Sequence, residues 1–156
     1  MDISDLLTPD AVIPALKIQA KKQLLQELAA KAHLVTRIPE RKIFEVLMER
    51  ERLGTTGVGQ GIAIPHGRLA IDKIAGVFAR LEQPIPYEAV DDQPVDLVFM
   101  LLAPEAAGAD HLKALARVSR LLRNQAVCER LRAARNPEAI YAILTEPTGP
   151  AAAHAA

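Results

Sequence analysis

Apolar residues recur at helical spacing in the first third of the chain. Residues 19–33 carry one such stripe, which predicts an amphipathic helix. Its apolar positions are Leu24, Leu25, Leu28 and Ala32. A second helix is expected to begin at Pro39, because proline is favoured at the first helical position, and to run to about Arg52. Gly54 is expected to end it.

The middle of the chain has the pattern of strands. Residues 95–102 are nearly all apolar, which predicts a strand inside a sheet. Residues 74–81 alternate loosely and predict another strand, whereas residues 83–93 contain prolines and an Asp-Asp pair and predict loop and sheet edge. Shorter segments are expected around residues 62–64, as a strand, and at residues 12–16, as a brief strand or turn limited by a proline.

The last third is helical again. Asp110 is expected to cap a helix whose apolar stripe is Leu112, Leu115, Val118 and Leu122. Shorter helices are expected at residues 127–134 and 137–144. Strands between helical segments predict one α/β domain over residues 1–145, with a small central mixed β-sheet flanked by helices on both sides. Residues 146–156 lack apolar periodicity and are expected to form a disordered tail.

Composition narrows the classes of function. Nineteen basic residues balance nineteen acidic ones, which argues against a nucleic-acid partner bound by a broad basic surface. The lone cysteine, Cys128, excludes a disulfide framework within the chain and is expected to be a small buried hydrophobe. The longest apolar run, residues 95–103, is interrupted by Asp96 and falls short of the roughly 20 residues of a membrane span. With an acidic start in place of a signal peptide, this pattern predicts a cytoplasmic protein without membrane insertion.

His66 is the first candidate for chemistry, in the glycine-rich segment Gly59-Gln60-Gly61-Ile62-Ala63-Ile64-Pro65-His66-Gly67. Pro65 fixes its own φ and Gly67 leaves room beside the imidazole, so the ring is expected at a strand end with free space around it. Such a ring could act as a nucleophile when another protein docks. The alternative is a histidine that merely ends a strand in a turn.

Arg50 and His111 are the other two candidates. Arg50 lies on the apolar face of its helix and leads into the glycine-rich segment, so it either meets an anion or snorkels and complements the helix dipole. His111 follows the most apolar strand and opens the next helix, where free N–H groups favour an anion such as phosphate. The alternative for His111 is an ordinary polar residue in a first turn.

Together these three residues suit a transferable phosphoryl group, because positioning and electrostatics do most of the work in phosphoryl transfer. Other sites fit less well. The glycine-rich segment is not a P-loop, since Ile62-Ala63 follows Gly61 where Lys-Ser/Thr would stand. A zinc site would need a third ligand beside His66 and His111. No metal and no cofactor are therefore expected.

The segment from Gly57 to Gly67 closely resembles the active-site segment of IIA components of the bacterial phosphotransferase system, mannitol/fructose class. The stretches at residues 76–85 and 92–99 resemble the nitrogen-regulatory branch, and the resemblance covers residues 3–145. It implies a central mixed sheet flanked by helices. It also implies phosphorylation of His66 on Nε2 by a phosphocarrier related to HPr (NPr), with Arg50 and His111 around the phosphoryl group.

The resemblance leaves the downstream partner open. Sugar-type members pass the phosphoryl group to a IIB domain, whereas nitrogen-branch members regulate proteins such as potassium transport systems and sensor kinases. No IIB or membrane domain accompanies the segment, so a regulatory phosphohistidine carrier is expected. A sugar-specific IIA and a non-catalytic interaction module are the alternatives.

Overall fold

A computed structural model describes residues 1–147 of the chain. Its helices are two short 3-10 turns, η1 (Ile3–Asp5) and η2 (Pro9–Ala11), and α1 (Lys21–Thr36), α2 (Glu40–Arg52), α3 (Gly108–Leu122), α4 (Gln125–Ala133) and α5 (Pro137–Leu144). Its strands are β1 (Val12–Leu16), β2 (Gly57–Gly59), β3 (Ile62–Ala63), β4 (His66–Leu69), β5 (Ala75–Ile85) and β6 (Val95–Pro104).

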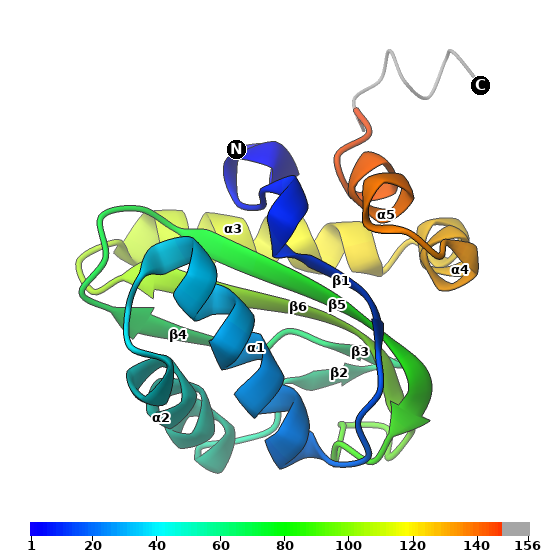
Figure 1. Ribbon diagram of the computed structural model, residues 1–156, viewed down its shortest axis with the longest axis horizontal. Coiled ribbons are helices and arrows are strands. Elements are labelled where there is room, and N and C mark those ends of the chain that lie inside the picture. Colours follow the sequence, from blue (N-terminus) through cyan, green and yellow to red (C-terminus); the bar gives the residue numbers. More distant parts are fainter. Residues whose placement is uncertain (148–156) are drawn as a thin grey trace.

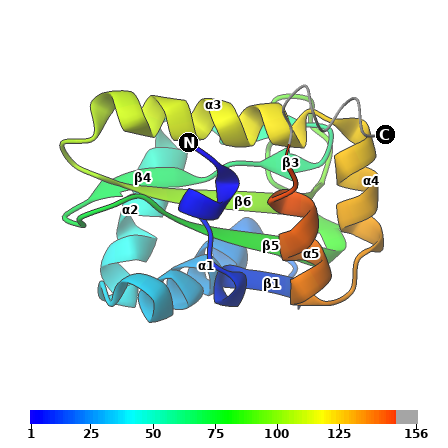
Figure 2. The ribbon, with the colours of Figure 1, turned by 90° about the horizontal axis from the view of Figure 1, so that it is seen from above.

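The strands form one mixed sheet in the order β1-β5-β6-β3-β2, with β4 also paired to β6. β5 and β6 are antiparallel, while β1 runs parallel to β5 and both β3 and β4 run parallel to β6. Helices α1 and α2 cover one face of the sheet and α3 lies on the other (Figures 1 and 2). This arrangement confirms the predicted α/β domain with helices on both sides of a mixed sheet.

Strand β6 lies inside the sheet, as its apolar sequence predicts. Its residues from Leu97 to Ala103 are fully buried, because helices cover both faces of the sheet and neighbouring strands pair with both edges of β6. The brief strand at residues 12–16 is confirmed as β1, which tolerates Pro14 because it lies at the edge of the sheet. Cys128 is buried, as expected.

The predicted loop over residues 83–93 is wrong at its start, since β5 continues to Ile85. The pairing of β5 with β6 is irregular between Arg80 and Ile85 and resumes where Ile85 faces Val95. Pro84 falls within this irregular stretch, where the missing N–H breaks no regular ladder. A proline therefore did not mark the strand end.

Helix α3 differs from its prediction in its N-cap and in the first residue of its buried face. Its N-cap is Ala107, so Asp110 lies inside the first turn and is not the cap. Its buried face consists of His111, Ala114, Val118, Leu121 and Leu122, whereas Leu112 is 67% exposed. Of the predicted stripe, Val118 and Leu122 are confirmed as buried, and Leu115 is partly buried against the core. Leu112 was wrong, because a buried histidine, not a leucine, begins the inward face.

The remaining helices match their predictions within a few residues. Helix α1 extends to Thr36, and Pro39 is the N-cap of α2 and not its first helical residue. The predicted tail lies largely outside the described residues; at its start, Glu146 accepts two hydrogen bonds from Arg130. Among the helices of residues 1–147, none combines the length and the apolar character needed to span a bilayer.

Candidate functional site

His66 begins β4 at a break in the pairing along β6. β3 and β4 pair in succession with the same edge of β6, and Ile64 and Pro65 lie between them. The carbonyl of Ile64 is thereby free to accept a hydrogen bond from Nδ1 of His66 at 2.8 Å. His66 was expected at the end of a strand, but it lies at the start of one, with the imidazole half-buried.

This contact sets the tautomer of His66. A carbonyl oxygen only accepts, so Nδ1 carries the proton and Nε2 keeps a lone pair. A neutral imidazole with a free Nε2 can attack an electrophile such as phosphorus. The backbone of the Ile64–Pro65 break thus selects which nitrogen of His66 is available for reaction.

Arg50 lies in the last turn of α2 and reaches this nitrogen. Its Nε donates to Nε2 of His66 at 3.2 Å, and its Nη1 donates to the carbonyl of Gly54 at 2.8 Å. The second contact satisfies a carbonyl beyond the end of the helix, as the dipole alternative expected. Arg50 therefore does both: it completes the C-terminus of α2 and holds a guanidinium against the candidate nucleophile.

Gly67 explains why α2 can approach so closely. A Cβ at Gly67 would lie 2.3 Å from Cγ1 of Val46 on α2, a separation that no real packing allows. We expected Gly67 to leave space beside the imidazole. In the structure, Gly67 instead leaves space for Val46 of α2. Side chains alternate along a strand, so Gly67 faces α2 while His66 faces the other way.

His111 is the third member of the site. Its ring centroid lies 5.6 Å from that of His66, at an interplanar angle of 73°. The residue is 5% exposed, and its Nε2 is a buried atom without a hydrogen-bond partner in the described part of the chain. Its backbone N–H is already bonded to the carbonyl of Ala107, so His111 offers its ring and not a free helix N–H.

Arg68 belongs to the site and was missed in the sequence. Its Nε donates to Nδ1 of His111 at 3.3 Å. Arg68 follows His66 by two positions in β4, so both side chains project from the same face of the sheet. If a strand had been predicted to begin at His66, the two-residue period of its side chains would have placed Arg68 on the same face as His66.

The electrostatics of the site favour an anion. Burial lowers the pKa of His66; the Ile64 carbonyl and Glu51 oppose this shift, while Arg50 reinforces it. Burial, followed by His66 and Arg68, lowers the pKa of His111. Both imidazoles are therefore neutral at pH 7, and the two guanidinium groups give the site a net positive charge.

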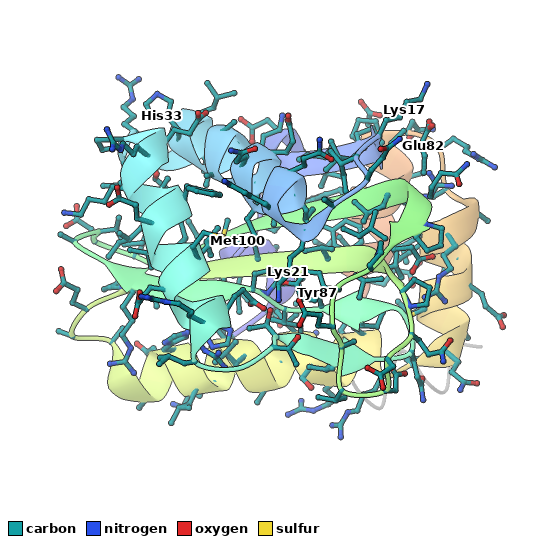
Figure 3. The ribbon with its side chains drawn as sticks, turned by 90° about the horizontal axis from the view of Figure 1, so that it is seen from below. Lys17, Lys21, His33, Glu82, Tyr87 and Met100 are labelled. Atoms are coloured by element: carbon teal, nitrogen blue, oxygen red, sulfur yellow. The ribbon has the colours of Figure 1, made fainter. Side chains whose placement is uncertain are left out.

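A second polar cluster is centred on Glu51, the residue that follows Arg50. The carboxylate of Glu51 pairs with Nζ of Lys21 at 2.8 Å, and the amide and hydroxyl of Thr56 both donate to it. The Tyr87 hydroxyl lies 2.9 Å from that of Thr56, and Nζ of Lys21 lies 4.4 Å from the centre of the Tyr87 ring (Figure 3). This cluster ties α1, α2 and the loop before β6 together.

The glycine-rich turn between β2 and β3 is held from outside. The amide of Gln60 donates to Asp91, and its carbonyl accepts from Arg132, which also forms a two-bond pair with Asp96. Gly61 adopts φ +82°, and a Cβ there would meet both Arg132 and Asp96. Hydrogen bonds thus connect the turn that leads to His66 with both β6 and α4.

Residues 1–147 contain no group of three or more His, Cys, Asp or Glu side chains placed to hold a metal ion. The atoms that converge at the site are guanidinium and imidazole nitrogens. Such donors suit a phosphoryl or carboxylate oxygen.

Comparison with known proteins agrees with this geometry. Residues 5–146 match the family described as "Phosphoenolpyruvate-dependent sugar phosphotransferase system, EIIA 2". The chain belongs to this EIIA 2 family. It is 61% identical over 153 residues to a nitrogen regulatory protein of Bradyrhizobium diazoefficiens, covering 97% of this chain and 100% of the relative.

Two further matches include both nitrogen-regulatory and sugar-specific proteins. A crystal structure of nitrogen regulatory protein IIA-Ntr from Neisseria meningitidis superimposes with a TM-score of 0.87 at 35% identity, covering 92% of this chain and 99% of that one. A fructose-specific EIIA component of Haloferax volcanii is 39% identical over 155 residues, covering 94% of this chain and 98% of the relative. The resemblance to the phosphotransferase system and its nitrogen-regulatory branch is confirmed.

Proposed function

We propose that the protein is a phosphohistidine carrier that accepts a phosphoryl group on Nε2 of His66 from an HPr-like phosphocarrier (NPr). We further propose that it regulates partner proteins according to its phosphorylation state. The observation that carries the proposal is the arrangement at His66: Nδ1 is tied to the Ile64 carbonyl, and Nε2 faces Arg50.

The transfer step requires no cofactor. Nε2 of His66 attacks the phosphorus of the donor's phosphohistidine, the new N–P bond forms, and the donor nitrogen keeps the electron pair of the broken bond. The Nδ1 proton stays in place, and the Ile64 carbonyl stabilises the positive charge that develops on the ring. His66 is thus prepared to act as a nucleophile without a separate general base.

Arg50 and His111 serve the phosphoryl oxygens. In the free protein the Nε–H of Arg50 occupies the Nε2 lone pair, and it must turn to the oxygens when the phosphoryl group arrives. The ring of His111 lies beside that of His66, and its Nε2, which has no hydrogen-bond partner within residues 1–147, can donate to another oxygen. Both contacts exist only when the phosphoryl group is present, so they favour the phosphorylated state.

Exposed apolar side chains next to the site suit a docking protein. Leu53, beside Gly54 and Arg50, is 78% exposed, and Leu112, beside His111, is 67% exposed. Apolar contacts near a charged centre are what a transient protein partner needs, because they contribute affinity without competing for the phosphoryl group. We assign this surface to the phosphocarrier, and we propose that the two proteins meet in the cytoplasm.

The test is to incubate the protein with phosphoenolpyruvate, enzyme I and phosphocarrier, and then to measure its mass. We expect one added phosphoryl group that is labile in acid, stable in alkali and lost in His66→Gln. His33→Gln is the matched control, because His33 is an exposed histidine that contacts only the Ile38 carbonyl in the described structure. It should accept the group normally.

A wild-type protein that gains no mass with competent donors would falsify the carrier function. That result would leave the non-catalytic interaction module as the better description. Acceptance that persists in His66→Gln would move the function to another residue.

Regulation by phosphorylation has its own test. A phosphoryl group brings a charge of roughly −1.5 to −2 to a site that is now positive, with little reason for the fold to change. A partner with an acidic or apolar surface, such as a potassium transport protein or a sensor kinase, should therefore bind the unphosphorylated form more tightly. Calorimetric titration of the two forms measures this; equal affinities contradict phosphorylation of His66 as the signal.

A sugar-specific role is the second candidate, favoured by the fructose-specific EIIA relative. Such a protein would pass the phosphoryl group on to a IIB protein. Adding a IIB protein to the phosphorylated form distinguishes the two roles: rapid loss of the added mass, with its appearance on IIB, indicates the sugar-specific one.

A further inference from the structure

Arg68 and His111 form a hydrogen-bonded pair beside His66. Arg68 is exposed and lies on β4, whereas His111 is buried and lies on α3. The bond between Nε of Arg68 and Nδ1 of His111 joins these two elements across 43 positions of sequence. It connects a surface cation to Nδ1 of a buried ring.

The chemistry of the pair decides the tautomer of His111. A guanidinium group donates hydrogen bonds and accepts none, so Nδ1 of His111 must present a lone pair to Arg68. In a neutral imidazole the proton is then on Nε2. That atom is the buried nitrogen without a partner in the described residues, so the contact with Arg68 produces an unsatisfied N–H donor.

An unsatisfied buried donor costs free energy, and it is tolerated where a ligand supplies the missing acceptor. His111 lies beside His66, where the proposed function places a phosphoryl group. The Nε2–H tautomer would donate to a phosphoryl oxygen, whereas the Nδ1–H tautomer would present a lone pair to that oxygen and repel it. The tautomer of His111 therefore decides whether its ring stabilises or destabilises the phosphoryl group on His66.

We propose that Arg68 is a positioning residue: its Nε–H holds His111 in the tautomer whose Nε2–H donates to the phosphoryl group on His66. The catalytic role of the contact rests on the proposed function. The tautomer itself can be measured in the unphosphorylated protein. The role of Arg68 and the proposed carrier function can therefore be contradicted independently of each other.

The first experiment measures the His111 tautomer by 15N NMR of the imidazole nitrogens in the full-length unphosphorylated protein. We expect a protonated Nε2 in wild type, and a ratio of Nε2–H to Nδ1–H that falls about tenfold in Arg68→Met, because a charge-assisted donor is lost. Arg68→Lys retains a donating cation and should restore most of the ratio. An unchanged ratio in Arg68→Met overturns the proposal.

Arg41→Met is the matched control for loss of charge. Arg41 is highly exposed, pairs with Glu45 and lies in the first turn of α2, far along the helix from Arg50. We expect no change in the His111 ratio there. A shift as large as that of Arg68→Met would show a general charge effect and overturn the specific role of Arg68.

The second experiment is a double-mutant cycle on the rate of phosphoryl acceptance. Arg68→Met should slow acceptance about tenfold in wild type and cause no further slowing in a His111→Ala background, because Arg68 acts through that ring. Equal slowing in both backgrounds means that Arg68 contacts the phosphoryl group or the donor directly, and overturns the proposal. A wild-type protein that accepts nothing contradicts the proposed function, while the NMR result still decides the tautomer.

Discussion

Two neighbouring residues at the end of α2 enter two different polar clusters. Glu51 joins Lys21, Thr56 and Tyr87, where opposite charges meet and both carboxylate oxygens accept hydrogen bonds. Arg50 joins the site cluster, which holds cations and neutral imidazoles and in which Nε2 of His111 has no partner among the described residues. One turn of one helix thus supplies a closed cluster and an open one.

The difference separates stability from function. Buried polar groups in native proteins are nearly always satisfied, so the Glu51 cluster follows the rule and holds elements together. The site cluster departs from the rule beside the candidate nucleophile, where an incoming phosphoryl group would complete it. Changes in the first cluster should lower stability, and changes in the second should slow transfer.

The largest effect is expected from Glu51→Ala. The substitution removes the buried carboxylate that pairs with Lys21 and accepts two hydrogen bonds from Thr56, so the free energy of unfolding should fall by about 3 kcal/mol. Denaturation by urea measures this loss. Glu49→Ala is the control, because its pair with Arg52 is exposed and should contribute less than about 1 kcal/mol. Equal losses would mean that the Glu51 cluster does not support the fold.

Arg50→Ala should produce the opposite pattern. The nucleophile remains, but a charge-assisted hydrogen bond worth roughly 1.5–3 kcal/mol is lost, so phosphoryl acceptance should slow about 10- to 100-fold. Single-turnover kinetics with the phosphorylated donor measure the rate, and Arg52→Ala, on the exposed side of the helix, is the control. A folded Arg50→Ala protein that accepts at the normal rate would limit Arg50 to the helix end.

Gly67→Ala tests the close contact between β4 and α2. The added Cβ would overlap Val46 on α2, so we expect a loss of about 1–3 kcal/mol and slower transfer together. Val46→Ala in the same chain removes the overlapping methyl and should recover part of both. Recovery of stability without recovery of transfer would show that Gly67 also matters beside the imidazole.

The smallest effect is expected in how the free energy of unfolding depends on pH. Burial lowers the pKa of His66 and His111 from 6.5, so the unfolded chain binds protons first as the pH falls. Stability should be level above pH 6.5 and decline below it, with up to about one extra proton bound per histidine on unfolding. Burial raises the pKa of Tyr87, so the hydroxyl of this residue does not titrate in this range. Calorimetry from pH 7.5 to 5.5 should show that the free energy of unfolding depends less steeply on pH in a His66→Gln/His111→Gln chain. An unchanged dependence contradicts the lowered pKa of these two histidines.

Local sequence was enough for much of the fold. The apolar stripe of α1, the helix ending near Gly54 and the buried strand β6 each follow from the spacing of residues close in the chain, which periodicity reads directly. His66 stood out for the same reason, since Pro65 and Gly67 restrict the backbone on both sides. Arg50 followed from its position on the inward face of α2.

The sequence by itself therefore determined which residues could react and which helices and strands would hold them. Only the tertiary structure decided how those residues meet. The phase of α3 depends on His111 being buried, and the inclusion of Arg68 depends on β4 pairing beside β6. Gly67 took its role from Val46, which lies on a different element. The reason is physical: periodicity reports one element's own faces, whereas a hydrogen bond across 43 positions exists only after helix and strand have packed.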